Sequence, residues 1–335
     1  MPLSTVLGQS GAIGTLERAL RTGKVHHAYR FEGPNGVGKE TTAFALAQAL
    51  LCDTPPPDGE AHHACGRCSA CHRAITLSTE PPQVPLHPDV VLIERGLYSP
   101  EALRRARPEL QDISVDQIRK CVLERASFPP HEGRARVIIV RRAHELSTSA
   151  ANALLKTLEE PPARTYFVLL TDRGSDLLDT VRSRTQLLRF APLPASLVQS
   201  LLEKRGLAAD VAKTAADLAG GSVAAALTHA DPSAAAERHA FIEGTMTALA
   251  GSDLAAAIAL SETRARDKDV LYDRLSALAT HFAQEGRAEA KAHPDRALRA
   301  AERYGNVARA IDELERNGSP ALVLEAMVAR LRHGL

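Results

Sequence analysis

Short apolar runs alternate with amphipathic stretches through residues 1–191 of the chain. Runs of this length, bounded by Gly or Pro, are typical of strands that are buried on both faces of a parallel sheet. Between them, apolar residues recur every three or four positions, as on one face of a helix. The pattern predicts strands at residues 28–31, 89–94, 137–140, 166–170 and 186–190, and helices at residues 10–21, 40–51, 114–126, 147–160 and 177–181. We therefore expect an α/β domain built on a parallel sheet.

The pattern changes after residue 191, where apolar positions keep only helical spacing and Ala becomes frequent. Helices are expected at residues 195–205, 208–219 and 222–228, followed by about five more in residues 233–335. Asp231-Pro232 marks a boundary, and Ser319-Pro320 supplies the N-cap and first residue of the last helix. We expect three domains, at residues 1–191, 192–231 and 232–335. The helices carry no catalytic constellation, so packing or oligomerisation is their expected role.

The composition excludes several classes of protein. Formal net charge is +1, so nothing marks the whole chain as a nucleic-acid or membrane binder. Aromatic residues make up 4% and Trp is absent, which leaves few side chains for base stacking. No apolar run reaches membrane-spanning length, and the first residues do not resemble a signal peptide. We expect a cytoplasmic protein that has no membrane partner.

A glycine-rich segment, Gly33-Pro-Asn-Gly-Val-Gly-Lys39, joins the first predicted strand to the next helix. Gly33, Gly36 and Gly38 allow backbone N–H groups to turn inward at a helix N-terminus, which favours phosphate. Lys39 would reach the β/γ-phosphate oxygens. These four residues are therefore our candidate cofactor-binding site. The P-loop pattern stops one residue short, because Glu40 stands where a Ser or Thr hydroxyl would bind Mg²⁺.

Arg141 and Arg142 follow the predicted strand at residues 137–140. In P-loop ATPases the strand at this point ends in acidic residues that hold Mg²⁺ and polarise the attacking water. Two arginines after a strand would by themselves indicate only a solvated turn. Together with Glu40, however, they indicate that both metal-holding positions have lost their chemistry.

Four of the five cysteines have the spacing C-x12-C-x2-C-x2-C. Two overlapping turns can direct four thiolates at one tetrahedral centre, which suits Zn²⁺. A shell of four thiolates leaves no open position, so the zinc would be structural. Reduced, unliganded cysteines are the alternative, and His62, His63 and His72 are possible substitute ligands. The expected ligands are Cys52, Cys65, Cys68 and Cys71, whereas Cys121 is expected in the core.

Two further motifs are Ala153-Leu-Leu-Lys-Thr-Leu-Glu-Glu-Pro-Pro162 and Ser183-Arg184. With the glycine loop and the four-cysteine module before them, they resemble the AAA+ clamp-loader subunits of bacterial DNA polymerase III over the whole length of the chain. The resemblance implies an AAA+ domain, a helical lid and a helical collar through which five subunits form a ring. Such a ring uses ATP to open the sliding clamp and place it on primed DNA.

The family contains ATP-hydrolysing subunits, gamma and tau, and a delta-prime subunit that does not hydrolyse ATP. Ser183 and Arg184 match the motif whose arginine acts on the nucleotide of a neighbouring subunit, and Thr185 replaces its final Cys. Ala224 stands where the ATPase subunits carry an arginine that senses the γ-phosphate. With Glu40 and the two arginines after the strand, this implies the delta-prime type. Its partners would be gamma/tau and delta in a hetero-pentamer, and ATP with Mg²⁺ would be neither hydrolysed nor productively bound.

The same motifs allow other functions for the chain. The chain would be an active clamp-loader ATPase if Thr41 or Thr42 served Mg²⁺ after a one-residue shift, but no acidic pair follows the strand before Arg141. A free-standing zinc DNA-binding protein is disfavoured because no basic recognition helix accompanies the cysteines. Arg184 could instead form a local salt bridge, and the basic stretch at residues 104–107 is expected to be solvated surface. Nucleotide held passively by the glycine loop is a further alternative.

Overall fold

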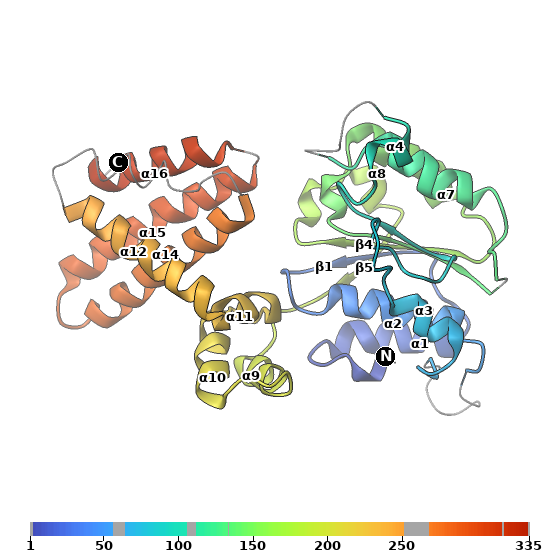
Figure 1. The fold of residues 1–335 in the computed structure, drawn as a ribbon, viewed down its shortest axis with the longest axis horizontal. Helices are drawn as coiled ribbons and strands as arrows, with labels where there is room; N and C mark the ends of the chain where they lie inside the picture. The colour runs from blue at the N-terminus through green and yellow to red at the C-terminus, as the bar shows by residue number, and fades with distance from the viewer. Residues whose placement is uncertain are drawn as a thin grey trace. The chain divides into compact units, whose positions relative to one another are not determined.

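The computed structural model describes residues 3–55, 64–105, 112–132, 134–250, 268–316 and 318–333. The chain divides into two compact units, Met1–Ala225 and Ala226–Leu335 (Figure 1).

The first unit contains a five-stranded parallel sheet in the order β2-β3-β4-β1-β5. The central strands are buried on both faces, as their continuous apolar runs predicted. All carboxyl ends of parallel strands meet at one edge of the sheet, so the loops that follow these strands lie together. The strands are β1 (Ala28–Glu32), β2 (Val90–Ile93), β3 (Arg136–Val140), β4 (Thr165–Thr171) and β5 (Gln186–Arg189).

Helices cover both faces of this sheet (Figure 1). One face packs in a single core with α1 (Ser10–Arg21) and α2 (Lys39–Leu51), next to which lies α3 (Ser69–Ile75). The opposite face packs in a second core with α7 (Thr148–Glu159) and α8 (Asp179–Arg182). That face also carries α4 (Pro100–Leu103), α5 (Val115–Gln117), α6 (Glu124–Ala126) and the π-helical stretch Ile118–Leu123. Short 3-10 turns lie at Leu3–Thr5, Ala143–Glu145 and Gly174–Asp176.

The α/β fold with a parallel sheet and a helical C-terminal region is confirmed. Ser114 and Ser147 cap their helices as local sequence suggests, each hydroxyl accepting an N–H three residues later at 3.2 Å. Cys121 is buried in the core, as expected. The π-helical stretch around it was not predicted, because helical periodicity does not distinguish i+5 from i+4 hydrogen bonding over one turn.

The first unit ends in helices α9 (Ala195–Glu203), α10 (Ala209–Leu218) and the beginning of α11 (Val223–Ala230). The second unit contains α12 (Pro232–Ala250), α14 (Lys268–Glu289), α15 (Pro294–Glu315) and α16 (Pro320–His333) around one apolar core. Part of the region expected to hold about five helices, residues 251–267, lies outside the described residues. Within the described part of the chain, no helix has the length and apolar character needed to span a membrane.

Candidate functional site

The glycine loop lies at the carboxyl edge of the sheet, between β1 and α2. Gly36 and Gly38 have φ of 72° and 102°, in the left-handed region where glycine is favoured. Gly33 is needed for another reason, because a Cβ there would lie 2.1 Å from the Phe190 carbonyl oxygen. The loop therefore has the backbone path that its sequence predicted.

Lys39 is held inside this loop, and 7% of the residue is exposed. Its Nζ donates hydrogen bonds to the carbonyl oxygen of Gly33 and, at 2.6 Å, to that of Pro34. Burial lowers the pKa of Lys39 to about 8, although the nearby Asp172 carboxylate acts in the opposite direction. Within the described part of the chain, the backbone N–H groups of residues 36–41 donate to no acceptor. The loop thus keeps the donors of a phosphate cradle.

The start of α11 closes over the loop. The Val223 N–H donates to the Gly36 carbonyl at 3.0 Å, and a Cβ on Gly36 would lie 2.3 Å from Ser222 Oγ and 2.7 Å from the Ala224 nitrogen. Ala224 therefore lies beside the loop, where the resemblance placed a phosphate-sensing arginine. A methyl group at this position supplies no positive charge.

Arg141 joins two of the residues that the sequence singled out separately. Its Nη2 forms an ion pair with the Glu40 carboxylate, and its Nη1 donates to Glu94 Oε2 at 2.8 Å. Arg141 follows β3, Glu94 follows β2, and Glu40 lies in the first turn of α2. A single guanidinium therefore connects the phosphate-loop helix to the ends of two strands.

This arrangement does not fit Mg²⁺. The guanidinium occupies the space between the Glu40 carboxylate and the carboxyl end of β3, where a P-loop ATPase holds its metal. Burial alone would lower the pKa of Arg141, but the hydrogen bonds and charges of Glu40 and Glu94 outweigh it and raise that pKa above its usual value. Arg141 is thus a permanent cation in place of a metal.

The remaining side chains at this edge are also paired. Arg142 Nε lies 2.9 Å from Glu145 Oε1. The His144 Nδ1 lies 3.0 Å from the Thr171 hydroxyl and 3.3 Å from Asp172 Oδ1. Burial is the main cause that lowers the pKa of His144 to about 4, so the imidazole is neutral at pH 7.

The four predicted zinc ligands are brought together at the end of α2 and the start of α3. Their sulfur atoms lie within 4.8 Å of one another, and two of the sulfur pairs are separated by 4.0 Å. Four thiolates around tetrahedral zinc would be about 3.8 Å apart, given Zn–S bonds of about 2.3 Å. Backbone N–H groups of Cys65, Cys68 and Cys71 donate to sulfur at 3.3–3.4 Å. The cysteines therefore fit structural zinc, and the exposed His72 is not in the cluster.

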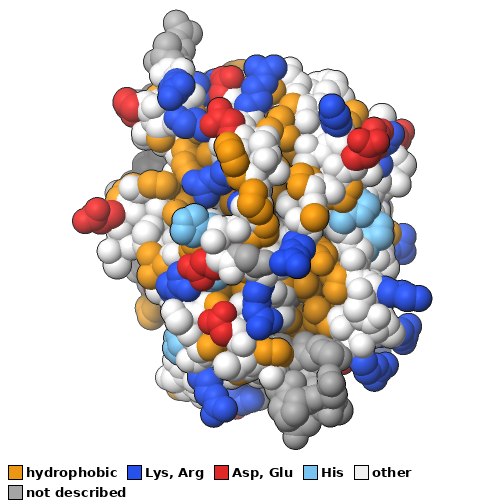
Figure 2. Space-filling model, turned by 90° about the vertical axis from the view of Figure 1, so that its right-hand side faces the viewer, with side chains coloured by type: hydrophobic (Ala, Val, Ile, Leu, Met, Phe, Trp, Pro, Cys, Tyr) orange, Lys and Arg blue, Asp and Glu red, His pale blue; other side chains and the backbone are white. Residues whose placement is uncertain are grey.

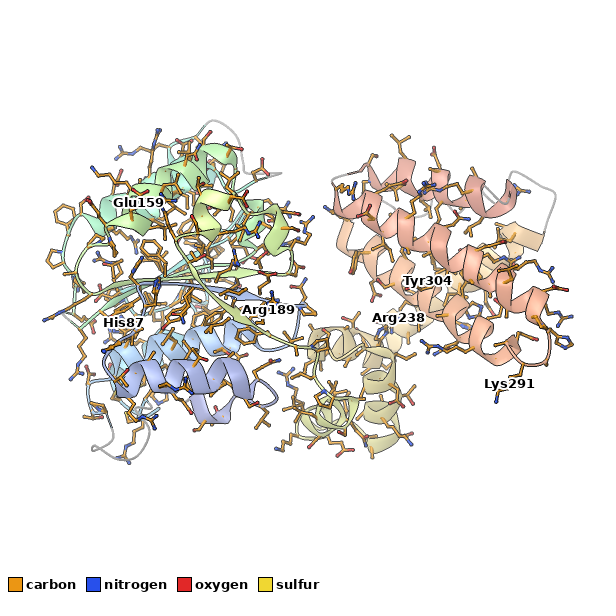
Figure 3. The ribbon with its side chains drawn as sticks, turned by 180° about the vertical axis from the view of Figure 1, so that it is seen from behind. His87, Glu159, Arg189, Arg238, Lys291 and Tyr304 are labelled. Carbon is orange, nitrogen blue, oxygen red and sulfur yellow. The ribbon has the colours of Figure 1, made fainter. Side chains whose placement is uncertain are left out.

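A charged network attaches this cysteine module to the sheet. Arg73, in α3, makes a bidentate ion pair with Glu132 at 2.6 and 2.7 Å. His87 Nε2 lies 3.3 Å from the same carboxylate and is buried just before β2 (Figure 3). Asp89 accepts the backbone N–H groups of His131 and Glu132 at 2.6 and 2.8 Å. The module is thus fixed to the start of β2 by polar contacts.

Arg184 lies on the surface of the opposite face, between α8 and β5. Its Nε donates to Glu159 Oε1 at 2.7 Å, and its Nη1 donates to the Thr180 carbonyl at 2.9 Å and to Ser183 Oγ at 3.2 Å. Figure 3 labels Glu159 on the side of the sheet that α7 covers. The local salt bridge considered from the sequence is therefore present, and one third of the Arg184 side chain is exposed.

Arg184 cannot serve the glycine loop of its own chain. In the register of the sheet, Gln186 pairs with Tyr29 in parallel, so residues before Gln186 lie at the amino edge. Gly33 follows β1 four residues beyond Tyr29, which corresponds to roughly 13 Å along a strand. Arg184 lies farther still from the loop. Arg184 and the phosphate loop thus occupy opposite edges of one sheet.

Sequence reasoning missed three residues of the phosphate-loop edge, which are Gln9, Glu94 and Asp172. Glu94 was assigned only to a strand, and Gln9 only to a segment before a helix. Gln9 donates to the Val37 and Ala191 carbonyls at 3.1 and 2.8 Å, and Asn35 donates to Asp172 at 2.9 Å. Glu94 and Asp172 directly follow buried strands, and this position in the sequence could have indicated that they lie at the carboxyl edge of the sheet. The candidates His62, His63 and Arg107 lie outside the described residues.

Figure 2 shows the side of the molecule that lies at the right in Figure 1, where basic and acidic side chains are interspersed among apolar ones. This mixture agrees with the near-zero net charge of the chain. Figure 2 therefore gives this face no single-sign patch for nucleic acid.

Two curated relatives match this chain over somewhat more than 200 residues each. It is 34% identical over 209 residues to DNA polymerase III subunit gamma/tau of Mycobacterium tuberculosis, covering 61% of this chain and 32% of that protein. It is 34% identical over 213 residues to DNA polymerase III subunit delta' of Escherichia coli, covering 63% of this chain and 57% of that protein. The chain thus spans about a third of the length of the gamma/tau relative and somewhat more than half of the length of the delta' relative.

A solved structure shares the fold over nearly the whole chain. It is a DNA polymerase III gamma subunit-related protein of Thermotoga maritima, with 17% identity, a TM-score of 0.50, and coverage of 95% of this chain and 98% of that one. The family described as DNA polymerase III, delta subunit matches residues 8–194. Because this match covers more than half of the chain, the protein belongs to that family of clamp-loader subunits.

Proposed function

We propose that the chain is a non-hydrolysing subunit of the delta-prime type in the DNA polymerase III clamp loader. It would complete the ring that loads the sliding clamp onto primed DNA and would donate Arg184 to the nucleotide of a neighbouring ATPase subunit. The observation that carries this proposal is the Arg141 guanidinium between Glu40 and Glu94. A cation that is part of the chain takes the place of the metal.

The chemistry of phosphoryl transfer explains why this matters. Catalysis at a P-loop depends on positioning and on charge neutralisation by Mg²⁺, by a water-orienting acid and by arginine. Arg141, Arg142 and Ala224 withhold these contributions from the chain's own loop. Arg184 lies at the other edge of the sheet, so its loss or retention is independent of that loop.

The wider assignment follows from the same proposal. The AAA+ domain would comprise residues 1–191, the lid residues 192–231 and the collar residues 232–335. Gamma/tau and delta would be the partners in a cytoplasmic hetero-pentamer, and the clamp and primed DNA would be reached through the complex. The chain would have no ATPase activity alone, although it would be a subunit of a DNA-directed DNA polymerase.

An active ATPase of the gamma/tau type is the alternative, because relatives of both names match equally well. It requires Thr41 or Thr42 to serve Mg²⁺. Thr42 is fully buried and its hydroxyl donates to the Gly38 carbonyl at 2.8 Å, which directs it away from the loop interior. Thr42 is therefore poorly placed to serve Mg²⁺, and the Arg141 guanidinium beside Glu40 supports the non-hydrolysing subunit.

Steady-state ATP hydrolysis tests the proposal. The purified chain should not turn over ATP with Mg²⁺, and adding it to its partner ATPase subunits should raise their turnover. Hydrolysis by the chain alone, abolished by Lys39→Ala, would establish the alternative. An unchanged rate after addition, with assembly verified by size-exclusion chromatography, would contradict the role in the ring.

We further propose that Cys52, Cys65, Cys68 and Cys71 hold a structural zinc ion. Zinc contributes about 10–16 kcal/mol to isolated modules, and the described part of the cysteine module has only a small buried cluster of its own, formed by Cys52, Ala64 and Cys71. Cys68→Ser should abolish zinc in elemental analysis of the purified chain and lower its melting temperature. Cys121→Ser is the matched control and should retain zinc. Retention of zinc by Cys68→Ser would contradict the assignment.

A further inference from the structure

The guanidinium of Arg184 is held from more than one side. Glu159 accepts the Nε–H at 2.7 Å and also pairs with Nη2. The Thr180 carbonyl and the Ser183 hydroxyl accept from Nη1 at 2.9 and 3.2 Å. These contacts define the plane of the guanidinium and not merely its position, since they engage all three of its nitrogen atoms.

Both sides of the ion pair are mounted on elements that pack into the same core. Glu159 is the last residue of α7, whose Leu154 and Leu158 are buried in that core. Thr180 lies in α8, where Val181 is fully buried. The backbone N–H of Arg184 donates to the Val181 carbonyl at 3.2 Å. The pair is therefore supported by rigid secondary structure on each side.

The arrangement leaves a donor available. A guanidinium has five N–H groups, and the contacts above occupy four of them, counting one on Nη2. Within the described part of the chain, the remaining Nη2 hydrogen has no acceptor. The side chains of Arg184 and Glu159 are 33% and 47% exposed, so the pair faces solvent and is accessible to a neighbouring subunit.

We propose that Glu159 is a positioning residue for Arg184, which fixes the guanidinium so that its free N–H meets the phosphate of the neighbouring subunit's nucleotide. This inference rests on the proposed function of Arg184 as a finger in trans. An arginine side chain loses rotamer entropy when it is immobilised, and a carboxylate that holds the planar fork removes this cost before the subunits meet. Preorganised charge of this kind acts on the transition state.

The alternative is that Glu159 restrains Arg184 and must release it. The two roles predict opposite signs. Removing a positioning carboxylate slows hydrolysis, because a displacement of about 1 Å can cost about 100-fold in rate. Removing a restraint accelerates hydrolysis, because the phosphate then competes with no carboxylate.

The test uses steady-state ATP hydrolysis by the assembled complex, with both kcat and KM measured. Glu159→Ala should lower kcat by about 10- to 100-fold with KM for ATP unchanged. Glu159→Gln keeps an acceptor without the charge and should lower kcat by a smaller factor, which separates positioning from a loss of folding. Glu160→Gln is the matched control. The Glu160 carboxylate is exposed and has no hydrogen-bond or ion-pair partner in the described part of the chain, although it is next to Glu159 in the sequence.

Arg184→Ala and the double variant distinguish this inference from the proposed function. Glu159→Ala should add nothing in the Arg184→Ala background, since it acts only through the guanidinium. If Arg184→Ala alone leaves turnover unchanged, the finger itself is refuted. If Arg184→Ala slows turnover while Glu159→Ala and Glu159→Gln do not, or if either accelerates it, the positioning role of Glu159 is overturned.

Discussion

The two edges of the sheet each hold an arginine against glutamate, and they use it differently. At the carboxyl edge, Arg141 is enclosed by Glu40 and Glu94 from two separate elements, and 21% of its side chain is exposed. At the amino edge, Arg184 meets the single carboxylate of Glu159, with 33% of its side chain exposed and one N–H directed to no described acceptor.

On the proposed function, this difference would let a nucleotide-site fold lose one function and keep another. The carboxyl edge has kept the loop geometry while an internal ion pair fills the metal position. The amino edge has kept a cation at the surface. Because the two edges are separated by the length of the strands, we expect changes at one to leave the other intact.

The largest effect should come from removing one basic side chain at each edge and comparing the two variants. Arg184→Ala should slow hydrolysis at the neighbouring site that it completes by about 10³- to 10⁵-fold, the usual contribution of an arginine finger. Lys39→Ala should leave that rate nearly unchanged, because the loop of this chain does not hydrolyse ATP under the proposed function. Rapid-quench measurements on the assembled complex give both rates. The comparison of the edges fails if Lys39→Ala is the more damaging variant.

A second test asks whether the carboxyl edge is closed to solvent. The pKa of His144 is lowered to about 4 by burial, below the value of about 6.5 in an unfolded chain. The folded state therefore binds fewer protons between these pH values. Stability is fully present above pH 6.5 and should decline as pH falls toward 4, by on the order of 2 kcal/mol.

Urea unfolding at pH 7 and pH 4.5 measures this effect. His144→Gln should reduce the difference in the free energy of unfolding between the two pH values by about the contribution of His144. His131→Gln, which changes an exposed side chain in the same unit, should leave that difference unchanged. Equal pH dependence in His144→Gln and the unchanged protein would show that the carboxyl edge is open to water.

A smaller effect is expected from restoring the metal ligands. Glu40→Thr combined with Arg141→Asp supplies a hydroxyl and a carboxylate where the guanidinium now lies, and should make ATP binding magnesium-dependent by about tenfold, or about 1.4 kcal/mol. Glu94→Gln is the control, since it weakens the ion pair without adding a metal ligand. Calorimetry on the isolated chain would detect the change. Identical affinities with and without Mg²⁺ in the restored variant would show that Arg141 is not what excludes the metal.

The sheet and most helices were predictable because their periods are local and regular. The apolar runs at residues 137–140 and 166–170 could only be buried strands, and β3 and β4 extend them by a residue or two. The four-cysteine spacing similarly predicted a cluster that the structure brings together. These features depend on residues close together in the chain.

The pairing at the carboxyl edge was not predictable from spacing. Glu40 and Arg141 were recognised separately as departures from a motif, and they are 101 positions apart in the sequence. Only the strand order places Glu94, after β2, beside Arg141, after β3. The contact of Arg184 with Glu159 depends in the same way on how α7 and α8 pack on one face. Such long-range contacts follow from tertiary structure.

The most direct test of the account is equilibrium binding of ATP to the isolated chain, with and without Mg²⁺. We expect any affinity to change by less than about twofold when Mg²⁺ is added, because Arg141 already occupies the metal position. Tightening of about tenfold or more by Mg²⁺ in the unchanged protein would contradict the central claim that this chain has given up its own metal site.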